Sequence, residues 1–162
     1  MSDQTLSKSI QNVQDALAKK GHQLKVIELA ESARTAQQAA DALGCEVAQI
    51  VKSLIFKTTE TDQPILILAS GVNRVDEKLI EQELGEKIGK ADANFTREVT
   101  GFAIGGIPPV GHKQAIKTFI DQDLLKFHDL WAAAGTPHAI FKFQAQDLAS
   151  LTGGKVIRIS CN

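Results

Sequence analysis

The sequence predicts one domain of mixed α+β class, and three observations support that prediction. Short segments rich in branched aliphatic residues, typical of strands, outnumber the long amphipathic helical segments. The helical segments are not spaced as the regular crossovers of a parallel α/β sheet. No repeat, linker or low-complexity stretch divides the 162 residues, and this length suits a single core. We therefore treat residues 1–162 as one domain.

The first elements are predicted from apolar spacing and helix caps. Residues 1–22 contain an amphipathic helix that ends at Gly21. Its apolar face is formed by Leu6, Ile10, Val13 and Leu17. A short strand is expected over residues 22–29. Thr35 is then placed to cap a second helix, which ends at Gly44.

Two aliphatic runs form the predicted centre of the sheet. Residues 50–58 and 64–70 read as strands of a hairpin, separated by the polar segment TETDQ. A third helix follows and is closed by Gly85; its apolar face is formed by Val75, Leu79, Ile80 and Leu84. Residues 94–100 form a short fourth helix.

Residues 101–112, GFAIGGIPPVGH, have a different character. Four glycines and two adjacent prolines exclude a regular helix or a central strand, so this segment is predicted to be a shaped loop. Four short strands and one helix complete the chain. The strands are expected at residues 115–120, 130–133, 139–143 and 156–159, and the helix at residues 146–151.

Composition excludes several classes of function. The formal net charge of -1 gives no broad positive field for duplex DNA or an anionic membrane. The longest stretch without a charge, residues 99–111, is too short and too broken to span a bilayer. The N-terminus lacks a secretory signal, so we expect a cytosolic protein in which Cys45 and Cys161 are reduced thiols.

Known catalytic and cofactor motifs are missing from the sequence. The four histidines show no HExxH or zinc-finger spacing, and we expect no metal. No Walker motif, dinucleotide fingerprint or GxSxG elbow is present, so no cofactor is expected. Aromatic residues make up only 5% of the chain, which disfavours a stacking platform for successive bases.

Two features remain as candidates for chemistry. Lys52 is a charged residue in an otherwise apolar strand; it either extends its ammonium from a sheet edge to solvent or binds a phosphate. The Gly-Gly-Ile-Pro-Pro segment is either a tight turn or a set of main-chain donors for a developing oxyanion.

Together, and in this order along the chain, these features resemble the YbaK family, also known as the prolyl-tRNA synthetase-associated editing domain family. The resemblance covers residues 28–159. It is carried by Thr35, Leu43-Gly44, Gln49 to Leu54 with Lys52, Thr100-Gly101, Gly105 to Pro109, Gly111, Ile120-Asp121 and Ala134-Gly135. It implies a curved, mostly antiparallel sheet or barrel flanked by helices. It also implies hydrolysis of the ester that joins a wrong amino acid to the 3′ end of a tRNA.

The resemblance assigns catalytic roles to five residues. Lys52 would hold a phosphate or ribose at the tRNA end. Main-chain N–H groups around Gly105, Gly106 and Ile107 would face the ester carbonyl, and Pro109 would fix the turn. Family members are described as using the terminal 2′-hydroxyl to orient or activate water. No protein general base is therefore needed in this interpretation.

Substrate contacts are expected from Ser53, Pro108, His112, Ala133 and Gly135. Ser53 points either to substrate or to the opposite face of its strand, and His112 either reaches the pocket or makes a hydrogen bond within a turn. Asp121 and Thr35 are expected to act as caps.

The sequence Ala133-Ala134-Gly135 departs from the Ser-Gly-Gly run of members that remove cysteine. This difference favours small apolar amino acids such as alanine or 2-aminobutyrate, with serine, threonine and cysteine left open.

The leading hypothesis is a deacylase of mischarged aminoacyl-tRNA, chiefly tRNA(Pro), acting in trans. Its partners would be the 3′ CCA end of the tRNA and, as a second candidate, prolyl-tRNA synthetase. A local basic surface of Lys52, Lys57, Lys113 and Lys117 would recruit the tRNA. The alternatives are a non-catalytic module that binds a tRNA end or a synthetase, and a hydrolase of small esters or thioesters.

Overall fold

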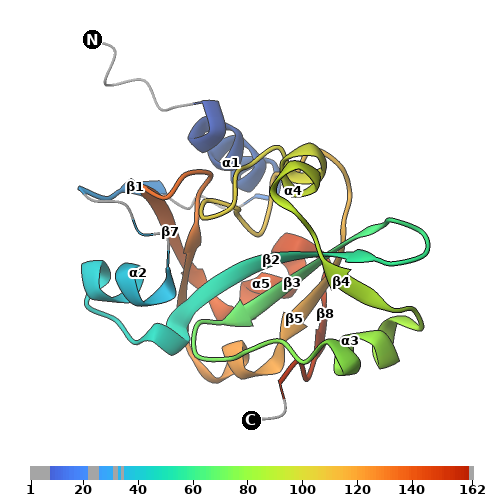
Figure 1. The fold of residues 1–162 in the computed structure, drawn as a ribbon. Coiled ribbons are helices and arrows are strands. Elements are labelled where there is room, and N and C mark those ends of the chain that lie inside the picture. The colour runs from blue at the N-terminus through green and yellow to red at the C-terminus, as the bar shows by residue number, and fades with distance from the viewer. Residues whose placement is uncertain (1–7, 22–25, 31–32, 34, 161–162) are drawn as a thin grey trace.

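The computed structural model describes residues 8–21, 26–30, 33 and 35–160, and these form one mixed sheet surrounded by helices (Figure 1). Leu6, residues 22–25 and Cys161, which the predictions above include, lie outside the described residues. The helices are α1 (Lys8–Lys19), α2 (Ala36–Leu43), α3 (Glu77–Leu84), α4 (Ala93–Thr100) and α5 (Leu148–Thr152), with the 3-10 helices η2 (Val47–Gln49), η3 (Gln122–Lys126) and η4 (Ala145–Asp147). The strands are β1 (Val26–Glu28), β2 (Ile50–Thr58), β3 (Pro64–Ser70), β4 (Ile88–Lys90), β5 (Lys117–Asp121), β6 (Asp129–Ala133), β7 (Ala139–Gln144) and β8 (Lys155–Ile157).

The sheet has the strand order β1-β7-β6-β2-β3-β5-β8, and β4 adds to β2. The pairs β1·β7, β6·β7, β2·β3 and β2·β4 are antiparallel, whereas β2·β6, β3·β5 and β5·β8 are parallel. In the described residues the sheet is open, with β1 and β8 at its edges. The α+β domain is confirmed, as an open mixed sheet rather than a closed barrel.

The predicted helix caps are confirmed. Thr35 forms a capping box at α2: its hydroxyl accepts from the N–H of Gln38, and the Gln38 side chain accepts from the Thr35 N–H. Gly44 and Gly85 end α2 and α3 in the left-handed conformation, with φ of 71° and 82°, which glycine adopts at little cost.

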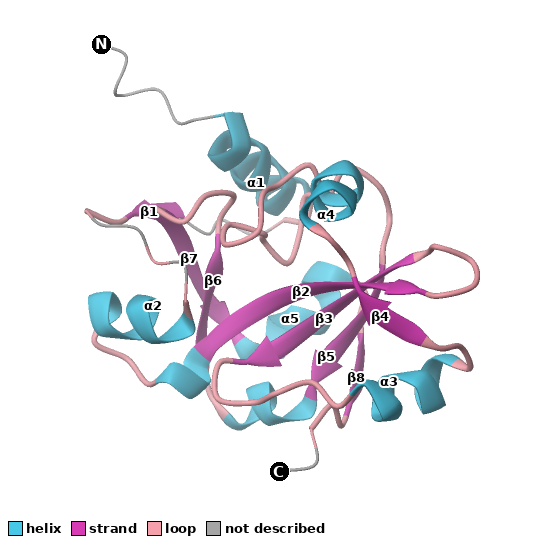
Figure 2. Ribbon diagram, in the orientation of Figure 1, coloured by secondary structure: helices cyan, strands magenta, loops and turns pink. Residues whose placement is uncertain are grey.

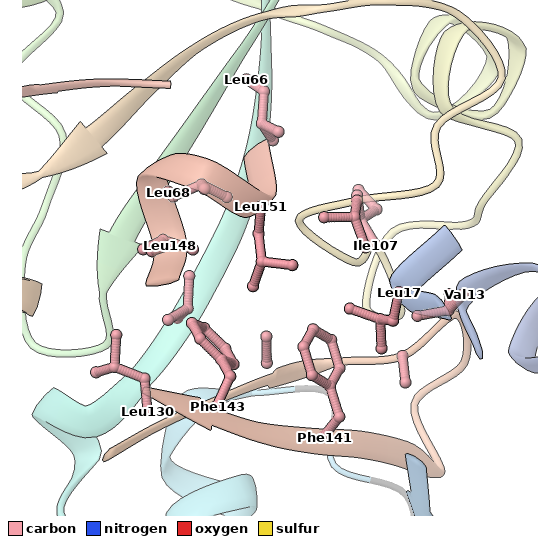
Figure 3. Packing of buried hydrophobic residues seen from close by; sticks show 14 of the residues in the cluster. Val13, Leu17, Leu66, Leu68, Ile107, Leu130, Phe141, Phe143, Leu148 and Leu151 are labelled. Carbon is pink, nitrogen blue, oxygen red and sulfur yellow. The ribbon is translucent and has the colours of Figure 1, made fainter. Parts of the chain in front are cut away.

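The hairpin of β2 and β3 is the centre of the fold, and both strands have the predicted bounds. Every residue of β3 is buried, because helices cover both of its faces. Leu66 and Leu68 point toward α5, where they meet Leu148 and Leu151 (Figure 3). Residues 65, 67 and 69 lie on the other face, in a second cluster with Ile80 of α3.

The N-terminal helix belongs to the main core. Ile10, Val13 and Leu17 of α1 are buried, as its apolar spacing predicts. Val13 and Leu17 lie close to Ile107 of the glycine-rich loop and to Phe141 of β7 (Figure 3). The helix therefore packs directly behind that loop.

Some details differ from the sequence prediction. The strand β4 was not predicted, because three residues carry too little pattern to be recognised. Residues 146–151 divide between η4 and α5, and β8 ends at Ile157 rather than at residue 159.

Helices surround the sheet, with α2 at one end and α3 at the other (Figure 2).

Candidate active site

A cavity of about 580 Å³ lies beside the part of strand β2 that has no paired strand on one edge. On this side β6 pairs only with Ile50 and Val51, and β4 begins to pair at Phe56. Among the described residues no strand pairs with residues 52–55 along this edge. Side chains and loops border the gap instead, and α2 lies at this end of the sheet (Figure 1).

Most of the cavity wall is small and apolar. The segment that includes α2 contributes Ala33, Thr35, Ala36, Gln37 and Ala39; β6 and β7 contribute Trp131, Ala132, Ala133, Ala139 and Ile140. Six of the lining residues are alanines, so side chains take up little of the space. Ile104, Gly105 and Ile107 of the loop, Gly71 after β3, and Val47 of η2 complete the wall with residues 50–54 of β2.

Among the described residues, Lys52 is the cation that lines this cavity. Its Nζ donates to the main-chain oxygen of Asn73 at 2.6 Å. Burial lowers the pKa of the half-buried Lys52 ammonium, the charge of Asp121 opposes that change, and Arg74 adds to it. An ammonium has three N–H donors, so two remain beyond the bond to Asn73.

Ser53 follows Lys52 in the strand and also lines the cavity. Successive side chains leave a strand on opposite faces, and both reach the cavity because it lies at the open edge of β2. The Ser53 Oγ is buried and has no hydrogen-bond partner in the described structure. An unpaired buried hydroxyl costs free energy, so a polar group of a ligand would be favoured there.

The glycine-rich loop contributes three residues to the cavity and uses others for packing. Ile104, Gly105 and Ile107 line the wall, and Gly105 has a φ of 99° that favours glycine. The N–H of Gly106 donates to Ala103 at 3.1 Å, so this expected oxyanion donor is already occupied. A Cβ on Gly106 would lie 2.6 Å from the Cα of Thr136. Gly106 therefore packs the loop against the turn after β6.

The remaining predicted residues lie behind the wall. The N–H of Gly135 donates to the carbonyl of Gly106 at 2.9 Å. A Cβ on Gly135 would lie 2.8 Å from the carbonyl oxygen of Ser9 in α1. Pro108 and Pro109 are buried, and the Nε2 of His112 lies 2.7 Å from the Pro108 oxygen. His112 thus makes the hydrogen bond within the turn, and burial lowers the pKa of its ring.

The structure brings together half of the predicted site residues in the cavity: Lys52, Ser53, Gly105, Ile107 and Ala133. Gly106, Pro108, Pro109, His112 and Gly135 support the wall from outside.

Sequence reasoning missed the contributions of α2, Ile104 and Trp131 to the wall. The single tryptophan, which two alanines follow in the same strand, was the available signal. Lys142 lies over its ring, 5.4 Å from the centroid.

Of the four lysines in the expected basic surface, Lys52 lines the cavity. Lys57 pairs with Asp62 at 3.7 Å and lies over the ring of Phe95, and Lys117 lies over the ring of Phe119. Neither of these two lysines, nor Lys113, lines the cavity. The lining residues that the structure describes include no histidine, cysteine or carboxylate either.

In the described part of the chain, no helix is long and apolar enough to cross a bilayer. The same residues contain no cluster of three or more histidine, cysteine, aspartate or glutamate side chains arranged to hold a metal ion.

Comparisons with known proteins agree with this geometry. A protein of Bacillus subtilis named YwhH is 30% identical over 148 residues, which cover 91% of this chain and 94% of that protein. A crystal structure described as a candidate trans-editing enzyme for prolyl-tRNA synthetase is 44% identical, with a TM-score of 0.91 over 98% of this chain and 100% of the other. A candidate Cys-tRNA(Pro)/Cys-tRNA(Cys) deacylase of Enterococcus faecalis is 24% identical over 78% of this chain and 77% of that protein.

The model of the aminoacyl-tRNA editing domain matches residues 30–151, which contain every residue that lines the cavity. The chain therefore belongs to the family of aminoacyl-tRNA editing domains.

Proposed function

We propose that the protein is a deacylase that hydrolyses mischarged aminoacyl-tRNA in trans, with tRNA(Pro) carrying a small wrong amino acid as the substrate. One observation carries the proposal: a cation, Lys52, and the loop residues Gly105 and Ile107 line one cavity within the region that matches the editing domain. The cavity is in the size range of small-molecule sites. We place the reaction in the cytoplasm, where charged tRNA is used.

In this proposal the tRNA enters through its 3′ CCA end. Lys52 binds a phosphate or the ribose of the terminal nucleotide with the donors that Asn73 leaves over. The aminoacyl ester then lies beside the loop, where main-chain groups of Gly105 and Ile107 stabilise the developing oxyanion. Prolyl-tRNA synthetase is a second proposed partner, which would supply the mischarged product.

The chemistry requires no protein nucleophile. Water adds to the ester carbonyl, the bond to the ribose oxygen breaks, and the products are a free amino acid and a tRNA with an intact 3′ end. An aminoacyl ester is already activated, so positioning and electrostatic stabilisation suffice. This matches a cavity whose described lining residues offer no histidine, cysteine or carboxylate.

The lining favours a small substrate side chain. Alanines and Trp131 surround the space, and Ser53 supplies one unpaired hydroxyl. Apolar walls separate alanine or 2-aminobutyrate from larger residues by only about 1–3 kcal/mol per methylene. The Ser53 hydroxyl gives serine, threonine or cysteine a hydrogen-bonding partner, so these remain in the proposed set.

The decisive experiment is steady-state deacylation with catalytic amounts of protein. The substrates are tRNA(Pro) charged with alanine, 2-aminobutyrate, serine, threonine, cysteine or proline. We expect multiple turnovers on at least one wrong amino acid and none on proline. Binding without turnover would instead assign the protein to the tRNA-binding modules. Hydrolysis of free aminoacyl esters at an equal rate would make it a small-ester hydrolase.

Replacing Lys52 tests the cation directly. Lys52→Ala removes a charge-assisted contact, and we expect kcat/KM for the preferred substrate to fall by about 10- to 100-fold. Lys57→Ala is the matched control, because Lys57 lies in the same strand but outside the cavity. Circular dichroism should show that both variants fold. Wild-type activity of a folded Lys52→Ala variant would contradict the role of Lys52.

A further inference from the structure

A buried carboxylate lies behind the turn that Lys52 contacts. Asp121 ends β5 and is 1% exposed. It accepts three hydrogen bonds: from the N–H of Asp123 at 2.9 Å, the N–H of Ser70 at 3.0 Å and the Nδ2 of Asn73 at 2.8 Å. Only the first of these caps the following helix. The other two hold residues 70–73, the turn that leaves β3.

Asn73 connects that carboxylate to Lys52. Its side-chain amide donates to Asp121 and to Asp123, both at 2.8 Å, and its own N–H donates to the carbonyl of Ser70. With these three bonds in place the main chain of this buried residue has one orientation. Its carbonyl oxygen accepts from the Nζ of Lys52 at 2.6 Å. The hydrogen bonds therefore form a continuous path from Asp121 to Lys52.

The charges in this arrangement complement one another without direct contact. No carboxylate lies within ion-pair distance of Lys52 in the described structure. Of the charged groups in the described structure, Asp121 stabilises the charge of its ammonium and Arg74 opposes it. A direct ion pair would balance the charge of Lys52 and compete with an anionic ligand for its N–H donors. Asp121, which lies behind the Asn73 carbonyl, stabilises the charge of Lys52 and leaves two of its N–H groups for a ligand.

We propose that Asp121 and Asn73 are positioning residues that keep Lys52 charged, hold it by a single hydrogen bond and leave its other donors for an anionic group of the substrate. The proposal rests on the proposed function for the identity of that anion, the phosphate of the tRNA end. The arrangement of Asp121, Asn73 and Lys52 stands on the geometry alone.

The first test measures Lys52 itself, without substrate. In protein with isotope-labelled lysines, the side-chain amine of Lys52 is followed by NMR against pH and assigned by its loss in Lys52→Arg. Asp121→Asn removes the negative charge that favours the ammonium, so we expect the titration midpoint of Lys52 to move to lower pH. Asp92→Asn, the same change at the exposed cap of α4, should leave the midpoint unchanged.

The second test uses Asn73→Ala, which keeps both carboxylates and the main-chain carbonyl but removes the amide that orients it. We expect kcat/KM for deacylation to fall about tenfold. In a Lys52→Ala background the same change should have almost no further effect, because a positioning residue acts through the lysine. A merely structural role would give equal losses in both backgrounds.

The outcomes separate the two proposals. If the wild-type protein hydrolyses no aminoacyl-tRNA, the proposed function fails while the Lys52 titration still decides the positioning. If Asp121→Asn does not fold, the titration is carried out on Asn73→Ala, where loss of the fixed acceptor should change the amine signal. Folded variants with a wild-type Lys52 signal, or additive losses in the double variant, would overturn the positioning role.

Discussion

The ring of His112 joins two parts of the glycine-rich loop through its hydrogen bond to the Pro108 carbonyl. Because the Pro108 carbonyl can only accept a hydrogen bond, the Nε2 of His112 carries a proton, and in the neutral ring Nδ1 is then unprotonated. Burial lowers the pKa of this ring, and the bond to Pro108 only partly opposes that effect. The folded protein therefore keeps His112 neutral at pH values where an unfolded chain would protonate it.

This difference predicts how stability depends on pH. Below the ordinary histidine pKa of about 6.5 the unfolded chain binds a proton that the folded protein rejects, so the free energy of unfolding falls as pH decreases. The limit is about 1.4 kcal/mol per pH unit for one full proton. In His112→Gln, urea unfolding between pH 7 and pH 5 should show a smaller decline than in the wild type. His138→Gln, at an exposed histidine, is the control. Equal slopes in all three proteins would contradict this role for His112.

Residue identity predicted part of the site. A lysine in an apolar strand and a loop of glycines and prolines drew attention to these segments, and the family resemblance selected Lys52, Gly105 and Ile107, which share the cavity. Asn73 was not found, because it acts through its main-chain carbonyl and no sequence pattern marks that use. Gly106 was expected to donate its N–H to the ester carbonyl and Gly135 to contact substrate, yet they are packed by Thr136 and Ser9, residues that only the tertiary fold brings close.

At the scale of elements, the loop of residues 101–112 depends on the turn between β6 and β7. Gly106 meets that turn through its carbonyl, which accepts from Gly135, and through the space that its missing side chain leaves to Thr136. The neighbours of Gly106 on either side line the cavity. Any displacement of this contact therefore moves part of the cavity wall.

Gly106→Ala should impair both stability and activity. The added Cβ would lie 2.6 Å from the Cα of Thr136, a backbone atom that cannot move independently. We expect the free energy of unfolding to fall by about 1–3 kcal/mol and deacylation to fall with it. Gly89→Ala is the matched control, because its Cβ would find its nearest neighbour at 3.9 Å. Urea unfolding and steady-state kinetics of both variants decide the point, and wild-type values for Gly106→Ala would remove the loop from the mechanism.

The elements themselves were predicted where local chemistry decides them. Thr35, Gly44 and Gly85 mark helix ends, and two aliphatic runs separated by polar residues give the bounds of β2 and β3. The parallel pairings of β2 with β6 and of β3 with β5 join segments far apart in the sequence, and no local pattern records them. The open edge of β2, where the cavity lies, follows from those pairings and was therefore not predicted.

For the molecule as a whole, the charge balance limits how tRNA can be bound. The net charge is -1, and Lys52 is the lysine that lines the cavity. A contact with one or two phosphates of a single strand gives a salt slope of roughly -0.7 per phosphate.

We therefore expect kcat/KM for deacylation, at substrate concentrations below KM, to fall about three- to sevenfold between 50 and 200 mM salt. Steady-state rates across that range, with circular dichroism to exclude unfolding, provide the measurement. A loss of 100-fold or more would indicate a broad basic interface, and recruitment by charges outside the cavity.

The packing of α1 bears on where the functional unit of this protein begins. The family match starts at residue 30, and all of the cavity-lining residues lie inside it. Gly135 nevertheless fits against the carbonyl of Ser9, and Gly111 fits against Ala16, both on α1. A fragment trimmed to the matched boundaries would retain each wall residue and lose the support on which the loop rests. In this chain, the boundary of the recognisable module and the boundary of the cooperative structure are different.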